Sequence, residues 1–240
     1  MHPKALLDAC SELVRQALTF EHPADAVVSR FFRQNGKSAY GSRERAVLAE
    51  TLYNVLRHKL RFEHFAPSGS GPRERRLAIL GFAMQLMDQR PGQSGATDFL
   101  KSALSEVEKA WLDACLAVRP EDMLERHRYS LPEWLDTALR AQFSDSAEFQ
   151  AMAQSLLKPA ALDLRVNTYT DRREDVQKEL DLLGLKCAVT PYSPWGLRLE
   201  GKPALTRLMQ AAGIEIIESE RQDDRSHPLV CFYYKKARWQ

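Results

Sequence analysis

Apolar and polar positions over the first 155 residues follow the period of amphipathic helices. Apolar side chains recur every three or four residues, and stretches rich in Gly, Pro and Ser at 67–72 and 90–95 interrupt the pattern as loops. One stretch, 42–60, is apolar around almost its whole circumference, which is typical of a helix at the centre of a bundle. Helices are therefore predicted over 5–20, 23–34, 42–60, 77–87, 99–104 and 107–118.

A further helix is predicted to begin at Ser130-Leu131-Pro132-Glu133. A Ser followed three residues later by Glu has the spacing of a capping box, with Ser130 at the N-cap, and Pro is tolerated in a first helical turn. The apolar positions that follow, from Trp134 to Phe143, lie on one face of this helix.

The pattern changes to a period of two after Lys158-Pro159. Alternating residues predict strands over 161–166, 185–190 and 197–199, and a helix between the first two ends at Gly184. A tail follows, in which a helix over 203–212 precedes two apolar runs, 214–217 and 229–234. The polar turn between these runs predicts an antiparallel pair.

These elements predict an α+β protein that is mainly an all-α bundle, followed by a small α+β domain and a tail of one helix and a β-hairpin. The domain boundaries inferred from the change of pattern give a helical domain over 1–145, a βαββ domain over 146–205 and an atypical tail over 206–240.

Composition is that of a globular chain: 240 residues, of which 44% are hydrophobic. No apolar run approaches the length that spans a bilayer, and the N-terminus does not resemble a signal peptide. We therefore expect a cytoplasmic protein with no membrane partner.

Charge is distributed unevenly, although the net charge is only +2. Residues 30–76 contain eleven Lys or Arg and four acidic residues, whereas residues 77–160 contain eight basic and twelve acidic ones. A basic block beside an acidic one is typical of a surface that binds a polyanion, and a solvated helix surface explains it equally well.

The four cysteines, Cys10, Cys115, Cys187 and Cys231, are far apart and do not have the spacing of metal ligands. Cys115 and Cys231 lie within apolar patterns, so buried structural thiols are expected there. No catalytic residue and no metal site is predicted.

Several segments resemble successive segments of one protein family, and they occur in the same order along the chain. Residues 40–45 (Tyr-Gly-Ser-Arg-Glu-Arg) and 52–57 (Leu-Tyr-Asn-Val-Leu-Arg) resemble the helix–loop–helix of the NusB-like RNA-binding domain. Residues 128–135 (Arg-Tyr-Ser-Leu-Pro-Glu-Trp-Leu) resemble the linker after that domain in RsmB-type (Sun/Fmu) ribosomal RNA cytosine methyltransferases. Residues 164–168 and 193–199 are similar to the small domain that precedes the catalytic fold of that family.

The resemblance covers about residues 3–205. It implies methylation of cytosine C5 in ribosomal RNA with S-adenosylmethionine, through a cysteine that attacks C6. The segments for that chemistry are missing from this sequence: no Gly-rich loop follows a strand, and neither cysteine loop is present. No cofactor is therefore expected for these residues, although the complete family enzyme uses S-adenosylmethionine.

If the bundle binds RNA, the contacts are expected to be made to phosphates by Lys and Arg around the loop before the 42–60 helix and along its exposed edge. For each residue a salt-bridged or solvated role is an equal alternative, and Trp195 is interpreted as pinning a hairpin. The candidates are Arg30, Arg33, Lys37, Arg43, Arg45, Arg57, Lys59 and Arg61.

The sequence thus predicts the RNA-binding part of a ribosomal RNA cytosine-C5 methyltransferase, inactive alone, with ribosomal RNA as its partner. One alternative is a NusB-like module of transcription antitermination that also binds a protein partner through the bundle. Another is a degenerate gene product, with a tail that arose by deletion or frameshift.

Overall fold

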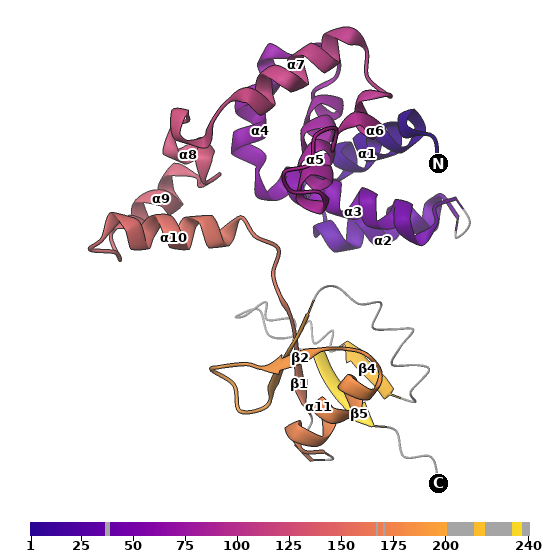
Figure 1. Cartoon of the computed structure of the whole chain (residues 1–240), viewed down its shortest axis with the longest axis vertical. Helices are drawn as coiled ribbons and strands as arrows, with labels where there is room; N and C mark the ends of the chain where they lie inside the picture. The colour runs from indigo at the N-terminus through magenta and orange to yellow at the C-terminus, as the bar shows by residue number, and fades with distance from the viewer. Residues whose placement is uncertain (37–38, 167, 170, 201–213, 219–231, 237–240) are drawn as a thin grey trace. The chain divides into compact units, whose positions relative to one another are not determined.

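The computed structural model describes residues 1–36, 39–166, 168–169, 171–200, 214–218 and 232–236, the last two segments by their backbone. The chain folds into two compact units, Met1–Lys158 and Pro159–Gln240 (Figure 1). We call them the helical unit and the α+β unit, and describe each by itself.

The helical unit consists of ten described α-helices and two short 3-10 turns, Ala66–Ser68 and Pro120–Asp122. The predicted helices are present, with boundaries shifted by a few residues. The helices are α1 (Pro3–Ala17), α2 (Ala24–Gln34), α3 (Ser42–Arg57), α4 (Lys59–Phe65), α5 (Arg73–Gln89), α6 (Asp98–Lys101), α7 (Glu106–Ala117), α8 (Glu125–Arg128), α9 (Glu133–Arg140) and α10 (Ser146–Leu156).

The centre of the bundle is α5, not α3 as the apolar pattern predicts. Every residue of α5 from Leu77 to Ala83 is buried, and α1, α3, α4 and α6 pack around it (Figure 1). Helix α3 buries one side and leaves Ala46 exposed. Both helices are apolar around much of their circumference, so the pattern could not distinguish which one is enclosed.

The predicted helix over 42–60 is in fact two helices that meet at His58. The backbone of His58 leaves the helical region, with φ −105° and ψ 24°. Its N–H still donates to the Asn54 carbonyl at 2.9 Å, and its own carbonyl accepts from Phe62 N–H at 2.9 Å. The apolar period continues through the break because α4 buries Phe62 and Phe65 in the same core, which is why the prediction of one helix was wrong.

The capping box predicted at Ser130 is also wrong. Helix α9 begins at Glu133 after Pro132, and no side chain caps it. Ser130 has a positive φ of 50°, and its hydroxyl accepts a hydrogen bond from Arg61 N–H at 3.4 Å. The capping box is at α7, where Ser105 accepts from Glu108 N–H and the Glu108 carboxylate accepts from Ser105 N–H.

A second small core lies where α9 and α10 pack together beside α8. Its fully buried members are Tyr129, Leu131, Phe149 and Ala153, and Phe143 packs against them. Tyr129 and Phe149 meet edge to face with ring centroids 6.3 Å apart. This core holds α9 and α10 together, and the hydrogen bond from Arg61 N–H to the Ser130 hydroxyl links the segment to α4.

The α+β unit is a five-stranded sheet in the order β2-β3-β1-β5-β4. The three strands of the predicted βαββ unit pair through β3, which is antiparallel to both β1 and β2, and the tail strands β4 and β5 form the predicted antiparallel pair. The tail joins the same sheet, because β5 pairs in parallel with β1. The elements are β1 (Leu162–Val166), α11 (Arg173–Leu182), β2 (Cys187–Val189), β3 (Gly196–Leu199), β4 (Ile214–Glu218) and β5 (Phe232–Lys236).

Helix α11 covers one face of this sheet. Its Val176 and Leu180 pack on Leu164, Val166 and Leu197. The helix ends as predicted, with Gly184 at φ +75° directly after the C-cap. The predicted tail helix at 203–212 and the polar turn at 219–227 lie outside the described residues.

Candidate nucleic-acid interface

The end of α2 and the start of α3 are held together by three aromatic rings and one arginine. The rings of Phe31 and Tyr40 stack at 5.9 Å between centroids, and Phe32 lies 6.1 Å from Tyr40. Arg45 on α3 lies over the Phe32 ring at 5.5 Å, and its Nε donates to the Tyr40 carbonyl at 3.0 Å. Arg45, a predicted RNA contact, therefore positions the loop between the two helices.

Three of the predicted residues are exposed around this junction. Arg30 and Arg33 lie one turn apart near the end of α2, and Arg43 lies in the first turn of α3. In the described part of the chain, none of the three guanidinium groups takes part in a hydrogen bond or an ion pair. We call these three residues the α2–α3 surface. Lys37, predicted for the same loop, lies outside the described residues.

An open pocket of about 330 Å³ borders this surface. It lies between the end of α1 and α2, and Arg30 forms part of its wall. Its wall combines cationic, polar and acidic side chains with the apolar Val27. The other residues of its wall are Arg15, Gln16, Thr19, Glu21, His22, Val27 and Gln34.

The remaining predicted residues, at the end of α3 and on α4, are engaged within the fold. Arg57 donates to Asn54 Oδ1 at 2.7 Å and lies 3.8 Å from the Glu50 carboxylate. Lys59 pairs with Glu63 at 2.9 Å. The structure thus separates the exposed α2–α3 surface from Arg57 and Lys59, which have acidic partners, and from Arg61, whose Nε is buried.

Arg61 and His58 belong to a desolvated basic region. Arg61 Nε and His58 Nδ1 are buried and make no hydrogen bond within the described residues. Burial lowers the pKa of Arg61. Burial, and then the charges of Arg61 and Arg57, lower the pKa of His58 from 6.5 to about 4. His58 is therefore neutral at pH 7, and the charge here is carried by the arginines.

A pair of histidines lies nearby, where α4 meets α8. The rings of His64 and His127 are 4.2 Å apart, and Arg126 Nε donates to His127 Nε2 at 3.0 Å. Burial, followed by the charges of His64 and Arg126, lowers the pKa of His127. The sequence analysis did not single out this pair, because the two residues are far apart in the chain.

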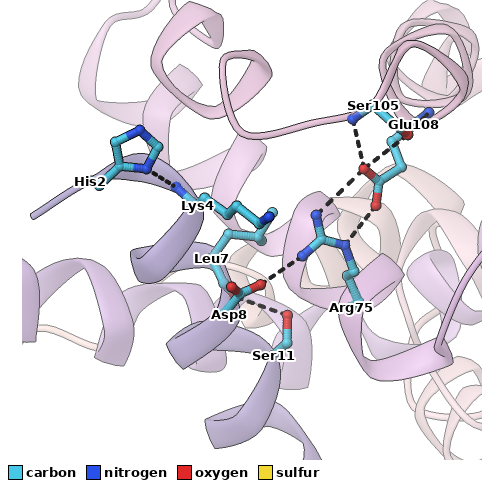
Figure 2. Close-up of polar contacts among 8 residues, drawn as sticks. All are labelled: His2, Lys4, Leu7, Asp8, Ser11, Arg75, Ser105 and Glu108. Carbon is cyan, nitrogen blue, oxygen red and sulfur yellow. Dashed lines mark hydrogen bonds and ion pairs between the residues drawn. The ribbon is translucent and has the colours of Figure 1, made fainter.

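Other arginines of the basic block stabilise the bundle. Arg75 Nε donates to Glu108 Oε1 at 2.6 Å, and its Nη1 donates to Asp8 Oδ1 at 2.9 Å, so that one guanidinium joins α1, α5 and α7 (Figure 2). Arg73 pairs with Glu63, and Arg76 donates to the Gly69 carbonyl. Much of the positive charge counted in the sequence is thus neutralised locally.

On the α+β unit, one aromatic and one cationic side chain lie together on the sheet. The Arg165 guanidinium carbon is 4.9 Å from the centroid of the Trp195 ring. Beside them, Arg198 Nε donates to Asp163 Oδ1 at 2.7 Å. Neither arginine was predicted as a site residue, because their neighbours across the strands become visible only in the sheet register.

The three cysteines in the described residues have raised thiol pKa values. Burial raises the pKa of Cys10 to about 12 and that of Cys115 to about 11. Burial and then the charge of Asp181 raise the pKa of half-buried Cys187. A nucleophilic cysteine needs the opposite shift, so none of the three is prepared for attack. Cys231 lies outside the described residues.

The strand–turn–helix of the α+β unit lacks the glycines of a dinucleotide-type site. A dinucleotide-type site needs glycines between strand and helix so that the backbone can approach the ligand closely. The turn from β1 to α11 spans 167–172 and contains no glycine. Within the described residues, no group of three or more His, Cys, Asp or Glu could hold a metal ion, and no helix is long and apolar enough to cross a membrane.

The chain matches one known family, described as "Methyltr_RsmF/B-like, ferredoxin-like domain", over residues 131–206. Residues 131–206 are an RsmF/B-like ferredoxin-like domain. The RsmF/B-like segment follows a mostly helical N-terminal part and contains the antiparallel strands β1, β2 and β3. It also takes in α9 and α10, which belong to the helical unit.

A solved structure titled "Crystal Structure of PH0851" is similar to this chain, with a TM-score of 0.51 and 19% sequence identity. The similarity covers 86% of this chain and 50% of that one. The likeness therefore extends over the helical part as well as the RsmF/B-like segment, at the level of the fold. The chain spans half the length of that structure. No curated protein matches the sequence.

Proposed function

We propose that these residues are the RNA-binding part of an RsmB-type ribosomal RNA cytosine-C5 methyltransferase, and that they do not transfer a methyl group by themselves. The observation that carries the proposal is the RsmF/B-like segment, which comes after helices that carry an exposed arginine surface. The raised thiol pKa values of Cys10 and Cys115 support the second half of the proposal.

The α2–α3 surface is the part of the helical unit best suited to bind RNA. Phosphate contacts need cations that are accessible and are not already committed to a carboxylate. Arg30, Arg33 and Arg43 meet that condition, whereas Arg57 and Lys59 have acidic partners. Arg45 and the aromatic rings around Tyr40 act as positioning groups that hold the two helix ends in place.

The test is RNA binding measured as a function of salt. Each phosphate contact to a single strand contributes about 0.7 to the slope of log K against log salt concentration. Replacing Arg30, Arg33 and Arg43 together by Gln should therefore reduce the slope by about 2. A matched control replaces Lys4, Arg90 and Lys158, which are exposed elsewhere on the helical unit, by Gln and should leave the slope unchanged.

Fluorescence anisotropy with labelled fragments of small-subunit ribosomal RNA provides the measurement. An absence of binding at low salt, or equal slopes for the two triple variants, would contradict the proposed interface. A second assay incubates the chain with labelled S-adenosylmethionine and immature ribosomal RNA. Transfer of label would contradict the claim that these residues do not methylate alone.

A further inference from the structure

The face of the α+β sheet opposite α11 carries exposed charged side chains from β1 and β3. Successive side chains of a strand point to opposite faces. Leu164 and Val166 of β1 are buried in the core with α11, so Asp163 and Arg165 lie on the other face and are exposed. The register of β1 with β3 places Arg198 opposite Asp163 and Gly196 opposite Arg165.

Gly196 lies opposite Arg165 in this register and is closely packed. A Cβ at this position would lie 2.0 Å from Thr190 Oγ1, because the Thr190 side chain occupies the space beside the glycine. Trp195 adjoins this glycine, and its ring lies against the guanidinium of Arg165 at 4.9 Å. The ring is held in place yet remains 42% exposed.

Two more aromatic side chains lie at the same end of the sheet. Because β1 and β3 are antiparallel, the turn that follows β1 and the turn that precedes β3 meet at one end. Tyr169 in the first turn is 99% exposed, and Tyr192 in the second is 100% exposed. Exposed aromatic rings beside a cation are the usual components of a surface on which unpaired bases stack.

We propose that Trp195, Arg165 and Tyr192 form a stacking platform for unpaired bases of single-stranded RNA, which we call the Trp195 platform. A base lies on the exposed part of the Trp195 ring, while the Arg165 guanidinium supports the ring and attracts the phosphate backbone. The choice of RNA rests on the function proposed above. Stacking of unpaired bases on aromatic side chains of a small sheet domain is an established mode of single-strand recognition.

The chemistry favours a base over other flat ligands. Every base has a π-face, so stacking needs no sequence match, and the positive charge of Arg165 complements a phosphate. Arg198 and Asp163 form an ion pair beside the platform.

The test compares two oligomers on the intact chain: an eight-residue oligouridine, and an abasic ribose-phosphate oligomer of the same length. Replacing Trp195 by Ala should weaken binding of the oligouridine roughly five- to 150-fold, the range expected for losing one base–aromatic stack, and leave the abasic oligomer unaffected. Trp195→Phe, which keeps an aromatic face, should retain most of the affinity.

The matched control is Leu182→Ala. Leu182 is 87% exposed on α11, the helix that covers the opposite face of the sheet, so its truncation should not change either affinity. Thermal unfolding of each variant separates a loss of folding from a loss of stacking. If Trp195→Ala folds and binds oligouridine like the unmodified chain, the platform does not exist.

A direct readout uses the unmodified chain. Photocrosslinking of an oligomer that contains 4-thiouridine, followed by mass spectrometry, should place crosslinks on the segment 192–198. Crosslinks confined to the helical unit would overturn the platform and leave the proposed function standing. If the chain binds no RNA at all, both the platform and the proposed function are overturned. If only the Arg30/Arg33/Arg43 variant loses binding of the abasic oligomer, that loss supports phosphate contacts at the α2–α3 surface.

Discussion

Arg75 on α5 and Glu108 on α7 form a two-point contact in which both carboxylate oxygens accept from the guanidinium, at 2.6 and 3.4 Å. Glu108 is also the residue that completes the capping box of α7. Burial alone would raise the pKa of Glu108, but the hydrogen bonds from Arg75 and Ser105 outweigh it and lower the pKa. One arginine thus couples the start of α7 to the central helix.

Replacing Arg75 by Gln should lower the free energy of unfolding by about 1.5–3 kcal/mol at pH 7, because the Glu108 carboxylate loses its charged donor. The pKa of Glu108 is lowered from 4.5 in the folded state, so this stabilisation is complete above pH 4.5 and is lost as the pH falls through the folded pKa. Urea unfolding at pH 7 and pH 3 measures both effects.

The exposed pair Arg119–Asp122 is the control for this prediction. Arg119→Gln should change stability by less than about 1 kcal/mol, because exposed ion pairs are screened by solvent. Equal losses for the two variants would show that the Arg75 contact is no stronger than an ordinary surface pair.

His58 should make the protein less stable as the pH falls. Its pKa is 6.5 in its ordinary state and about 4 when folded, so the unfolded chain binds its proton first. Stability from this residue is complete above pH 6.5 and is lost between pH 6.5 and 4, by about 3 kcal/mol in total. His58→Gln should flatten the pH dependence of unfolding over that range, whereas the exposed His22→Gln should leave it unchanged. A His58 variant with an unaltered pH profile would be evidence against a buried neutral histidine.

Gly81 should tolerate no larger side chain. A Cβ on Gly81 would lie 2.7 Å from the Thr51 carbonyl oxygen and 2.7 Å from Val55 Cγ2, both on α3. The carbonyl belongs to a helix and cannot move without separating α3 from α5. Gly81→Ala should therefore cost about 1–3 kcal/mol of stability in a thermal or urea unfolding experiment, although alanine normally favours helices. Gln89→Ala, at the exposed end of the same helix, should cost little; a stabilised Gly81→Ala protein would disprove the close packing.

Thiol reactivity should follow burial. Cys10 and Cys115 are buried and their pKa values are raised to about 12 and 11, so little thiolate forms at pH 8. Iodoacetamide labelling of the native chain, mapped by mass spectrometry, should modify half-buried Cys187 before either of them. Rapid labelling of Cys115 in the folded protein would indicate an accessible thiol and reopen the question of a nucleophile there.

The sequence predicted the helices and strands well because periodicity reports which face of an element is buried. It predicted the end of α2 at Asn35 and the end of α11 before Gly184, since these depend on local turn preferences. It failed at Ser130, where the Ser-x-x-Glu spacing suggested a cap, because the hydroxyl binds Arg61 N–H, which lies 69 residues away in the chain.

The candidate interface could likewise be predicted only in part from the sequence. Counting charges found the basic block, and α2, α3 and α4 do carry those residues. Counting charged residues along the sequence could not distinguish the exposed Arg33 and Arg43 from the ion-paired Arg57 and Arg75, because an ion pair depends on which residues folding brings next to each arginine. The contact between Arg165 and Trp195 was not predicted for the same reason: they are 30 positions apart in the numbering and meet only through the β1–β3 register.

By itself, the sequence determined the succession of helices and strands, the change from an all-α to an α+β pattern near Lys158, and the resemblance that the RsmF/B-like match supports over residues 131–206. The tertiary structure decided that α5 rather than α3 is enclosed, that β5 joins β1 in one sheet, and which arginines remain accessible. The physical reason is the sequence separation over which each effect acts. Helix and strand propensity and periodicity involve residues that are neighbours in the chain. Burial and ion pairing depend on contacts between residues that only folding brings together.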